Sequence, residues 1–135
     1  MVARFNGLIT SRLLAGTLAA LRYREAETPD VRYCSGAWEL PIIAERLARE
    51  GNTDAVVALG CVVRGETPHF DYVAGEAARG LATVALQTGV PVVFGVLTTD
   101  TIEQAMARAS GTASNKGWEA ALTALDTIAA TQGRT

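Results

Sequence analysis

The segment Arg64-Gly65-Glu66-Thr67-Pro68-His69-Phe70-Asp71-Tyr72 joins an apolar run to a long helical pattern and holds several side chains that could do chemistry. Thr67 is of a type that caps helix N-termini, and Pro68 suits the first helical position. The free N–H groups of such a turn, together with the helix dipole, bind anions and phosphate above all. The segment therefore predicts an anion site, and a purely structural cap is the simpler alternative.

His69 is the only histidine of the chain and lies at the start of this predicted helix. An imidazole exchanges protons near neutral pH, so His69 is a candidate proton shuttle. A surface or capping histidine is the alternative. Asp71 either orients the imidazole or is a first-turn acid that complements the helix dipole, and we favour the second interpretation.

Further candidates are Trp38, Glu39, Phe94 and Arg108, and for all but Glu39 a purely structural role is the alternative. Trp38 and Glu39 follow a short apolar run, where an indole can stack on a flat heterocycle and a neighbouring carboxylate can read the ring's hydrogen-bonding edge. The alternative for Trp38 is to pack its loop against the core. Phe94 lies in an apolar run and would ordinarily be core. Arg108, near the end of a short helical pattern, either complements the helix dipole or holds a phosphate.

Several kinds of catalytic site have no counterpart in the sequence. It lacks the glycine spacing of nucleotide-binding loops, a Gly-x-Ser-x-Gly elbow and any cluster of metal ligands. A proton carrier, an anion site and a stacking aromatic remain. Together they favour a condensation reaction over redox chemistry or hydrolysis.

Apolar runs alternate with segments of helical period, which is typical of an α/β fold with a buried parallel sheet. The predicted strands are residues 31–35, 54–63 and 90–97, and the predicted helices are residues 10–24, 41–50, 68–88, 100–109 and 116–130. Asp100-Thr101-Ile102-Glu103 is a capping-box pattern, and Gly89 is expected to end the long helix. The apolar stripe of the last helix comprises Trp118, Ala121, Leu122, Leu125 and Ile128. Ligands of such sheets bind at the carboxyl ends of the strands.

The composition suits one small domain, residues 1–135, that buries part of its surface in self-association, because 49% of its residues are apolar. A net charge of −2 without a basic stripe does not favour nucleic acid. No apolar run reaches membrane-spanning length, and Met1-Val2-Ala3-Arg4 does not resemble a signal peptide, so we expect a cytoplasmic protein. Cys34 and Cys61 are expected to be reduced, buried thiols.

Five blocks of sequence follow one another in a set order: Arg4-Phe5-Asn6, Gly36-Ala37-Trp38-Glu39-Leu40-Pro41, Arg64-Gly65-Glu66-Thr67-Pro68-His69-Phe70-Asp71-Tyr72-Val73, Phe94-Gly95-Val96-Leu97-Thr98-Thr99 and Asn115-Lys116-Gly117. Together they resemble the lumazine synthase family, and the likeness extends over nearly the whole chain. The resemblance implies a flavodoxin-like three-layer sandwich whose four-stranded parallel sheet is flanked by helices. It also implies homopentamers with active sites shared between neighbouring subunits, and leaves open whether the pentamers close into a sixty-subunit icosahedral shell.

The resemblance assigns a role to each candidate residue. His69 would be the proton donor and acceptor. The pyrimidine and its ribityl chain would contact Phe5, Ala37, Trp38, Glu39, Cys61, Val62 and Val63, with Phe94 supplied by the neighbouring subunit. The sugar phosphate would be held by Glu66 and Thr67, with Arg108 from the neighbour.

The implied activity is that of 6,7-dimethyl-8-ribityllumazine synthase, a transferase of riboflavin biosynthesis that acts in the penultimate step. It condenses 5-amino-6-(D-ribitylamino)uracil with 3,4-dihydroxy-2-butanone 4-phosphate, and it requires no cofactor or metal. Two alternatives are an archaeal-type riboflavin synthase and a non-catalytic shell protein of the same fold. The intact Pro68-His69-Phe70-Asp71-Tyr72 block argues against the first, and the combination of Phe5, His69 and Arg108 argues against the second.

The chain departs from the family pattern in two places. Family members open with a full strand before Arg-Phe-Asn, whereas Met1-Val2-Ala3 precede that block here, so the first strand is expected to be a stub or to begin further upstream. Family members often carry Gly-Thr-Lys where this sequence has Ser110-Gly111-Thr112. Arg108 is therefore expected to provide more of the charge opposite the phosphate.

Overall fold

The computed structural model describes residues 1–134, in which strands and helices alternate along the chain. The strands are β1 (Val2–Ala3), β2 (Tyr33–Cys34), β3 (Val56–Val63) and β4 (Val92–Thr99). The helices are α1 (Gly7–Tyr23), the 3₁₀ turn η1 (Ala37–Glu39), α2 (Leu40–Arg49), α3 (His69–Thr88), α4 (Ile102–Arg108) and α5 (Lys116–Thr131). Every strand pair is parallel and the sheet order is β2-β1-β3-β4, which confirms the flavodoxin-like α/β fold.

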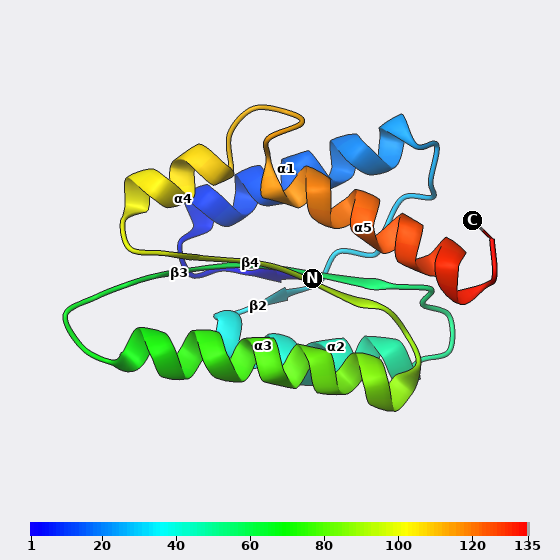
Figure 1. Cartoon of the computed structure of the whole chain (residues 1–135), viewed down its shortest axis with the longest axis horizontal. Helices are drawn as coiled ribbons and strands as arrows, with labels where there is room; N and C mark the ends of the chain where they lie inside the picture. The colour runs from blue at the N-terminus through cyan, green and yellow to red at the C-terminus, as the bar shows by residue number, and fades with distance from the viewer. Residues whose placement is uncertain (135) are drawn as a thin grey trace.

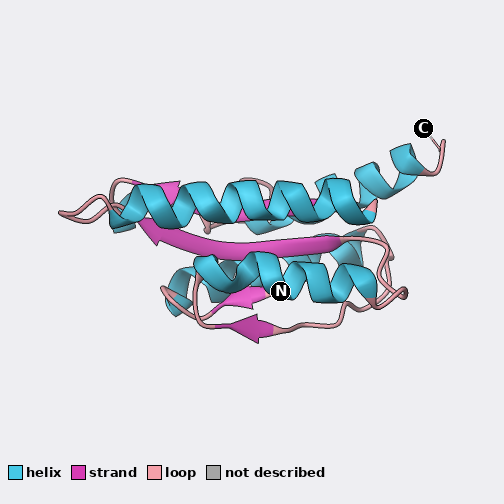
Figure 2. Ribbon diagram, turned by 90° about the horizontal axis from the view of Figure 1, so that it is seen from below, coloured by secondary structure: helices cyan, strands magenta, loops and turns pink. Residues whose placement is uncertain are grey.

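The sheet is the middle of three layers (Figure 1). Helices α1, α4 and α5 lie on one of its faces, and α2 and α3 lie on the other. Figure 2 views the second face, with α2 and α3 side by side in front of the strands. Each face has its own core of buried apolar residues, centred on Leu40 and Leu81 on the α2–α3 side and on Ile9 and Leu13 on the other. Burial on both faces explains why the strands read as continuous apolar runs.

β3 and β4 form the extended part of the sheet. They pair over eight residues each, from Val56 opposite Val92 to Val63 opposite Thr99. The predicted strand 90–97 therefore lies two residues too early, because pairing with β3 carries β4 on through two threonines that an apolar pattern excludes. The predicted strand 54–63 begins two residues too early, because pairing with β4 starts only at Val56.

β1 is short but occupies an interior position of the sheet. Val2 pairs with Tyr33 of β2 and with Leu59 of β3. The backbone of Met1 adds two hydrogen bonds to β3, in which its nitrogen donates to the carbonyl of Val57 at 2.9 Å and its carbonyl accepts from Leu59 at 3.0 Å. β2 is as short as β1, so only two residues of the predicted strand 31–35 join the ladder.

The helices confirm the predicted order, with corrections at their starts. α1 begins at Gly7 rather than at residue 10, because the carbonyl of Asn6 already accepts from the N–H groups of Ile9 and Thr10. The capping box of α4 is formed by Thr101 and Gln104, one position after the predicted one: the hydroxyl of Thr101 accepts from the N–H of Gln104 at 3.2 Å.

The long helix α3 ends as predicted, at Gly89 in the left-handed conformation with φ 73°. It faces the core through Ala77, Leu81 and Val84. Within residues 1–134 no helix is both long and apolar enough to cross a membrane.

The packing of α5 against α1 corrects the predicted apolar stripe of α5. The fully buried residues of α5 are Gly117, Ala120, Ala121 and Ala124, whereas the larger residues of the predicted stripe are only half-buried. The two helices meet so closely that a Cβ on Gly117 would collide with the carbonyl oxygen of Leu13. Gly117 therefore lies where α5 meets α1, and a larger side chain would not fit there.

Candidate active site

Phe5 follows the carboxyl end of β1 and projects into solvent, with 72% of its surface exposed. The backbone beneath it is fixed by the neighbouring strand. The N–H of Arg4 donates to the carbonyl of Cys34, and that of Phe5 donates to the carbonyl of Ser35, both at 2.9 Å. An exposed aromatic ring on a fixed backbone suits stacking on a flat ligand.

Asn6 fixes the same turn from the other side. Its backbone is left-handed, with φ 57° and ψ 45°, a conformation that asparagine tolerates better than other residues with a side chain. Its side-chain amide donates to the carbonyl of Cys61 on β3 at 2.9 Å. The turn that presents Phe5 is thus bonded to both neighbouring strands, a feature that the sequence patterns did not single out.

The segment after β2 was predicted as a loop and is instead the 3₁₀ turn η1. Ala37 is buried, and Trp38 is 56% exposed at the surface, so the indole does not pack the segment against the core. The carboxylate of Glu39 accepts from the N–H of Gly36 at 2.9 Å. Glu39 therefore stabilises the turn that presents Trp38, in addition to any contact with a ligand.

Cys61, Val62 and Val63 form the carboxyl end of β3. Cys61 is only 3% exposed, and burial raises the pKa of its thiol to about 11. Such a thiol stays protonated at neutral pH and lines a site without acting as a nucleophile. Val62 and Val63 are half-buried. Both cysteines are free, as predicted, but Cys34 is half-buried rather than buried, because its strand lies at the edge of the sheet.

The turn from β3 into α3 exposes Glu66, Thr67 and His69. The predicted cap at Thr67 is wrong by one position, because Pro68 is the residue that flanks the helix. The carbonyl of Pro68 accepts from the N–H of Asp71 at 3.0 Å, and no side chain caps the helix start. The first N–H groups of a helix without a side-chain cap remain available to an external acceptor. The carboxylate of Asp71 forms an ion pair with Arg64 at 3.6 Å.

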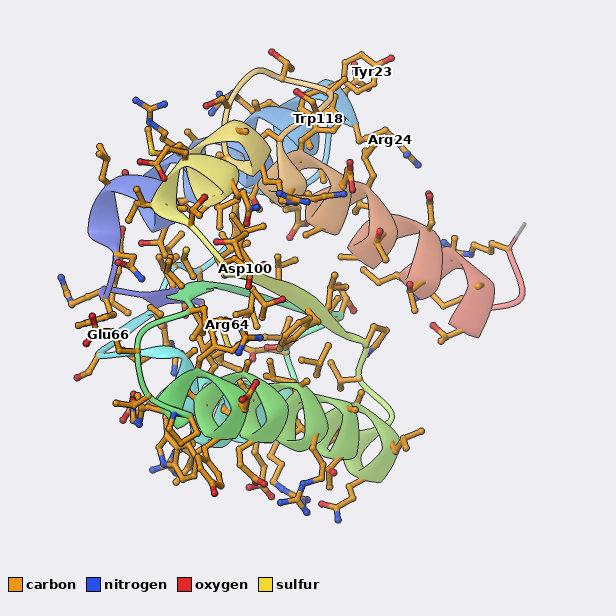
Figure 3. The ribbon with its side chains drawn as sticks, turned by 60° about the vertical axis from the view of Figure 1, so that its left-hand side comes forward. Tyr23, Arg24, Arg64, Glu66, Asp100 and Trp118 are labelled. Atoms are coloured by element: carbon orange, nitrogen blue, oxygen red, sulfur yellow. The ribbon has the colours of Figure 1, made fainter. Side chains whose placement is uncertain are left out.

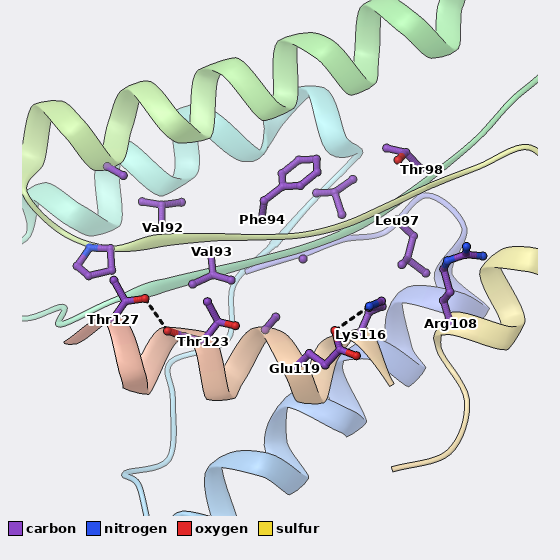
Figure 4. Close-up of a pocket in the computed structure, with 15 residues that line it drawn as sticks. Val92, Val93, Phe94, Leu97, Thr98, Arg108, Lys116, Glu119, Thr123 and Thr127 are labelled. Atoms are coloured by element: carbon purple, nitrogen blue, oxygen red, sulfur yellow. Dashed lines mark hydrogen bonds and ion pairs between the residues drawn. The ribbon is translucent and has the colours of Figure 1, made fainter. Parts of the chain in front are cut away.

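A groove of about 650 Å³ runs along β4, the other edge of the sheet (Figure 4). Phe94 lines this groove and is 42% exposed because β4 is an edge strand, which corrects the expectation of a core residue. Arg108 lines the same groove from the end of α4. Figure 4 shows Phe94 on the α3 side of β4 and Arg108 on the α5 side.

The charges of the groove are unevenly paired. Lys116 and Glu119 of α5 form an ion pair at 2.7 Å. The guanidinium of Arg108 donates to the carbonyl of Gln104 at 3.4 Å and forms no ion pair within residues 1–134, which leaves it available to an anion. Lys116 stands in the block Asn115-Lys116-Gly117, but its place in the groove was not predicted.

The candidate residues thus form two groups within one chain. Phe94 and Arg108 line the groove at β4. The other group lies at the carboxyl ends of β1, β2 and β3 and comprises Phe5, Ala37, Trp38, Glu39, Cys61, Val62, Val63, Glu66, Thr67 and His69, none of which lines that groove. Within residues 1–134, no group of three or more acidic, histidine or cysteine side chains is placed to hold a metal ion.

A parallel sheet of this order defines a flavodoxin-like α/β protein, a class in which ligands bind at the carboxyl edge of the sheet. The sequence model of the family described as 6,7-dimethyl-8-ribityllumazine synthase matches residues 1–132 of the 135. The chain belongs to this family of riboflavin biosynthesis, which confirms the resemblance noted in the sequence.

Proposed function

We propose that the chain condenses 5-amino-6-(D-ribitylamino)uracil with 3,4-dihydroxy-2-butanone 4-phosphate to give 6,7-dimethyl-8-ribityllumazine. The match to the lumazine synthase family over residues 1–132 is the observation that carries this proposal. The exposed aromatic side chains, the uncapped start of α3 and the free cation of Arg108 support it, since the reaction joins a flat heterocycle to a phosphate ester.

In the proposed reaction, the 5-amino group of the pyrimidine adds to the ketone of the sugar phosphate, and loss of water gives an imine. Loss of a proton and departure of inorganic phosphate follow. The enol that this elimination leaves tautomerises to a ketone. The ribitylamino nitrogen then attacks this ketone, and loss of a second water closes the new ring. Every step moves a proton, and His69 is the side chain that we assign to this transfer.

The pyrimidine subsite in this proposal contains Phe5 and Trp38 at the carboxyl edge of the sheet. Phe5 stacks on the ring, and the backbone of η1 reads its polar edge. The N–H groups at the start of α3, with the backbone of Glu66 and Thr67, receive the phosphate. The carboxylate of Glu66 is itself an anion, so its backbone is the part suited to this task.

We further propose that a second copy completes the site, because Phe94 and Arg108 line a groove to which the carboxyl-edge residues do not contribute. A neighbour would bring its groove against the carboxyl edge, so that Arg108 reaches the phosphate. In a closed ring every subunit then gives one group and receives the other. The family resemblance favours a homopentamer of chains that each form one domain.

The test is an absorbance assay for the lumazine with both substrates present, accompanied by sedimentation of the purified protein. We expect product and phosphate in equal amounts, and none when either substrate is omitted. Conversion of two lumazines to riboflavin would instead identify a riboflavin synthase. A folded oligomer that forms neither product would identify a non-catalytic assembly.

A further inference from the structure

Arg64 joins three parts of the molecule next to the candidate phosphate site. Its backbone N–H donates to the carbonyl of Thr99 at 2.8 Å, which continues the β3–β4 ladder by one residue. Its side chain lies 2.9 Å from the carboxylate of Asp100, at the end of β4 (Figure 3). The same guanidinium lies 3.6 Å from the carboxylate of Asp71 and 4.4 Å from the centre of the Phe70 ring, both in the first turn of α3.

Asp100 holds the side chain of Arg64 in place because the backbone of Asp100 is itself fixed by a hydrogen bond. Its N–H donates to the side-chain oxygen of Gln104 at 2.9 Å, as part of the capping arrangement that starts α4. The carboxylate of Asp100 takes no part in that cap and is free for Arg64. Through these bonds Arg64 connects the first turn of α3 with the first turn of α4.

The turn between Arg64 and α3 lacks comparable support. Glu66 and Thr67 are exposed, and no side chain caps the helix. A Cβ on Gly65 would meet no atom within 4 Å, so this part of the turn is not packed against anything. The position of His69 and of the first N–H groups of α3 consequently depends on what holds the two ends of the turn.

We propose that Arg64 is a positioning residue for the phosphate end of the site, an inference that rests on the proposed function. Arg64 holds the first turn of α3 through Phe70 and Asp71, while Asp100 anchors it to the end of β4. Phosphate and His69 then meet at a set distance. Arg64 itself makes no contact with the substrate in this arrangement, because its charge is already paired.

Exposed ion pairs contribute little to folding, and the side chains of Arg64 and Asp100 are 47% and 70% exposed, so their variants are expected to fold. Catalysis depends far more steeply on geometry, because small displacements of reacting groups lower turnover strongly. Positioning therefore predicts a loss of activity with little loss of stability.

The decisive variant is Asp100→Asn, because positioning and direct attraction predict opposite results for it. Asparagine keeps the shape of the side chain but removes a negative charge and weakens the hold on Arg64. If Arg64 attracted phosphate directly, this change would free its charge and tighten phosphate binding. If Arg64 positions α3, the same change weakens phosphate binding.

Phosphate binding is measured as protection of His69 from modification by diethyl pyrocarbonate. This modification reports on a single site because the chain has no other histidine. Inorganic phosphate should slow this modification in the wild-type oligomer. We expect Asp100→Asn, Arg64→Met and Arg64→Lys each to raise the phosphate concentration for half-protection about fivefold. Lysine keeps the charge of Arg64 but cannot reproduce its planar, forked contacts. The control is Arg79→Met, which removes another exposed ion pair of α3.

The kinetic arm is the assay with both substrates. The three variants should lower kcat/KM for the sugar phosphate about tenfold or more and leave the KM of the pyrimidine unchanged. Protection in Asp100→Asn equal to or stronger than in the wild type overturns Arg64 as a positioning residue and leaves the proposed function standing. Absence of protection in every chain, the wild type included, overturns the proposed phosphate site and this inference with it.

Discussion

The side-chain amide of Asn6 donates a hydrogen bond of 2.9 Å to the carbonyl oxygen of Cys61, and so joins the turn after β1 to the carboxyl end of β3. Asn6 also has a left-handed backbone, so it contributes to how Phe5 is presented, together with the hydrogen bonds of Arg4 and Phe5 to the backbone at the end of β2. We expect Asn6→Ala to lower the free energy of unfolding by about 2 kcal/mol, since it loses the hydrogen bond and strains the backbone. Urea unfolding measures this change.

Asn6→Gly separates the two contributions. Glycine adopts the left-handed conformation without strain, so this variant should lose only about 1 kcal/mol. Both variants should raise the KM of the pyrimidine by a similar factor, because each frees the turn that carries Phe5. Equal destabilisation by alanine and glycine would show that the backbone conformation of Asn6 carries no cost.

His69→Ala should lower turnover by about ten- to a thousandfold, because solvent and the remaining geometry still carry protons in its absence. His69 is exposed, so the urea midpoint should stay unchanged. Full turnover in His69→Ala would remove the imidazole from the mechanism.

Arg108→Ala should raise the KM of the sugar phosphate roughly ten- to a hundredfold and leave that of the pyrimidine nearly unchanged, because it deletes a charge-assisted contact to phosphate alone. Steady-state kinetics with each substrate varied in turn give the two values. Arg46→Ala, which removes an exposed arginine of α2 away from the groove at β4, is the matched control. Equal weakening of both substrates would contradict the assignment of Arg108 to the phosphate.

Mixing His69→Ala with Arg108→Ala tests whether the site is shared between subunits. Each variant is expected to be weakly active alone, and joint unfolding and reassembly should restore activity. With random equal mixing in a closed ring, about a quarter of the interfaces pair an intact His69 with an intact Arg108. A mixture no more active than its parents would mean that both residues come from one chain, or that they never meet at a site.

Cys61 predicts a loss of stability at alkaline pH. Its pKa in the folded chain is about 11 against an ordinary value of 9.0, so between these values the unfolded chain releases a proton that the folded chain retains. The contribution of Cys61 to the free energy of unfolding is therefore fully present below about pH 9. It falls as the pH rises, by up to about 1.4 kcal/mol per pH unit. The slope of unfolding free energy against pH should be shallower in Cys61→Ala than in the wild type. Parallel slopes would show that the thiol ionises alike in both states.

The sequence alone was sufficient to predict the α/β class, the long helix α3 with its end at Gly89, and the turn that carries His69. These features depend on local patterns: apolar runs for buried strands, a period near 3.6 for α3 and a glycine where the backbone turns left-handed. The five ordered blocks also led to the correct family, because a set of motifs in fixed order is far more specific than any one of them.

Only the tertiary structure decided how the candidate residues are grouped. The exposure of Phe94 follows from the place of β4 at the edge of the sheet, and the order of strands is not a local property of the chain. The contacts of Asn6 with Cys61 and of Arg64 with Asp100 join residues 55 and 36 positions apart. Such pairs leave no periodic signal, since they depend on which strands lie side by side, and that arrangement is set by packing across the whole sheet.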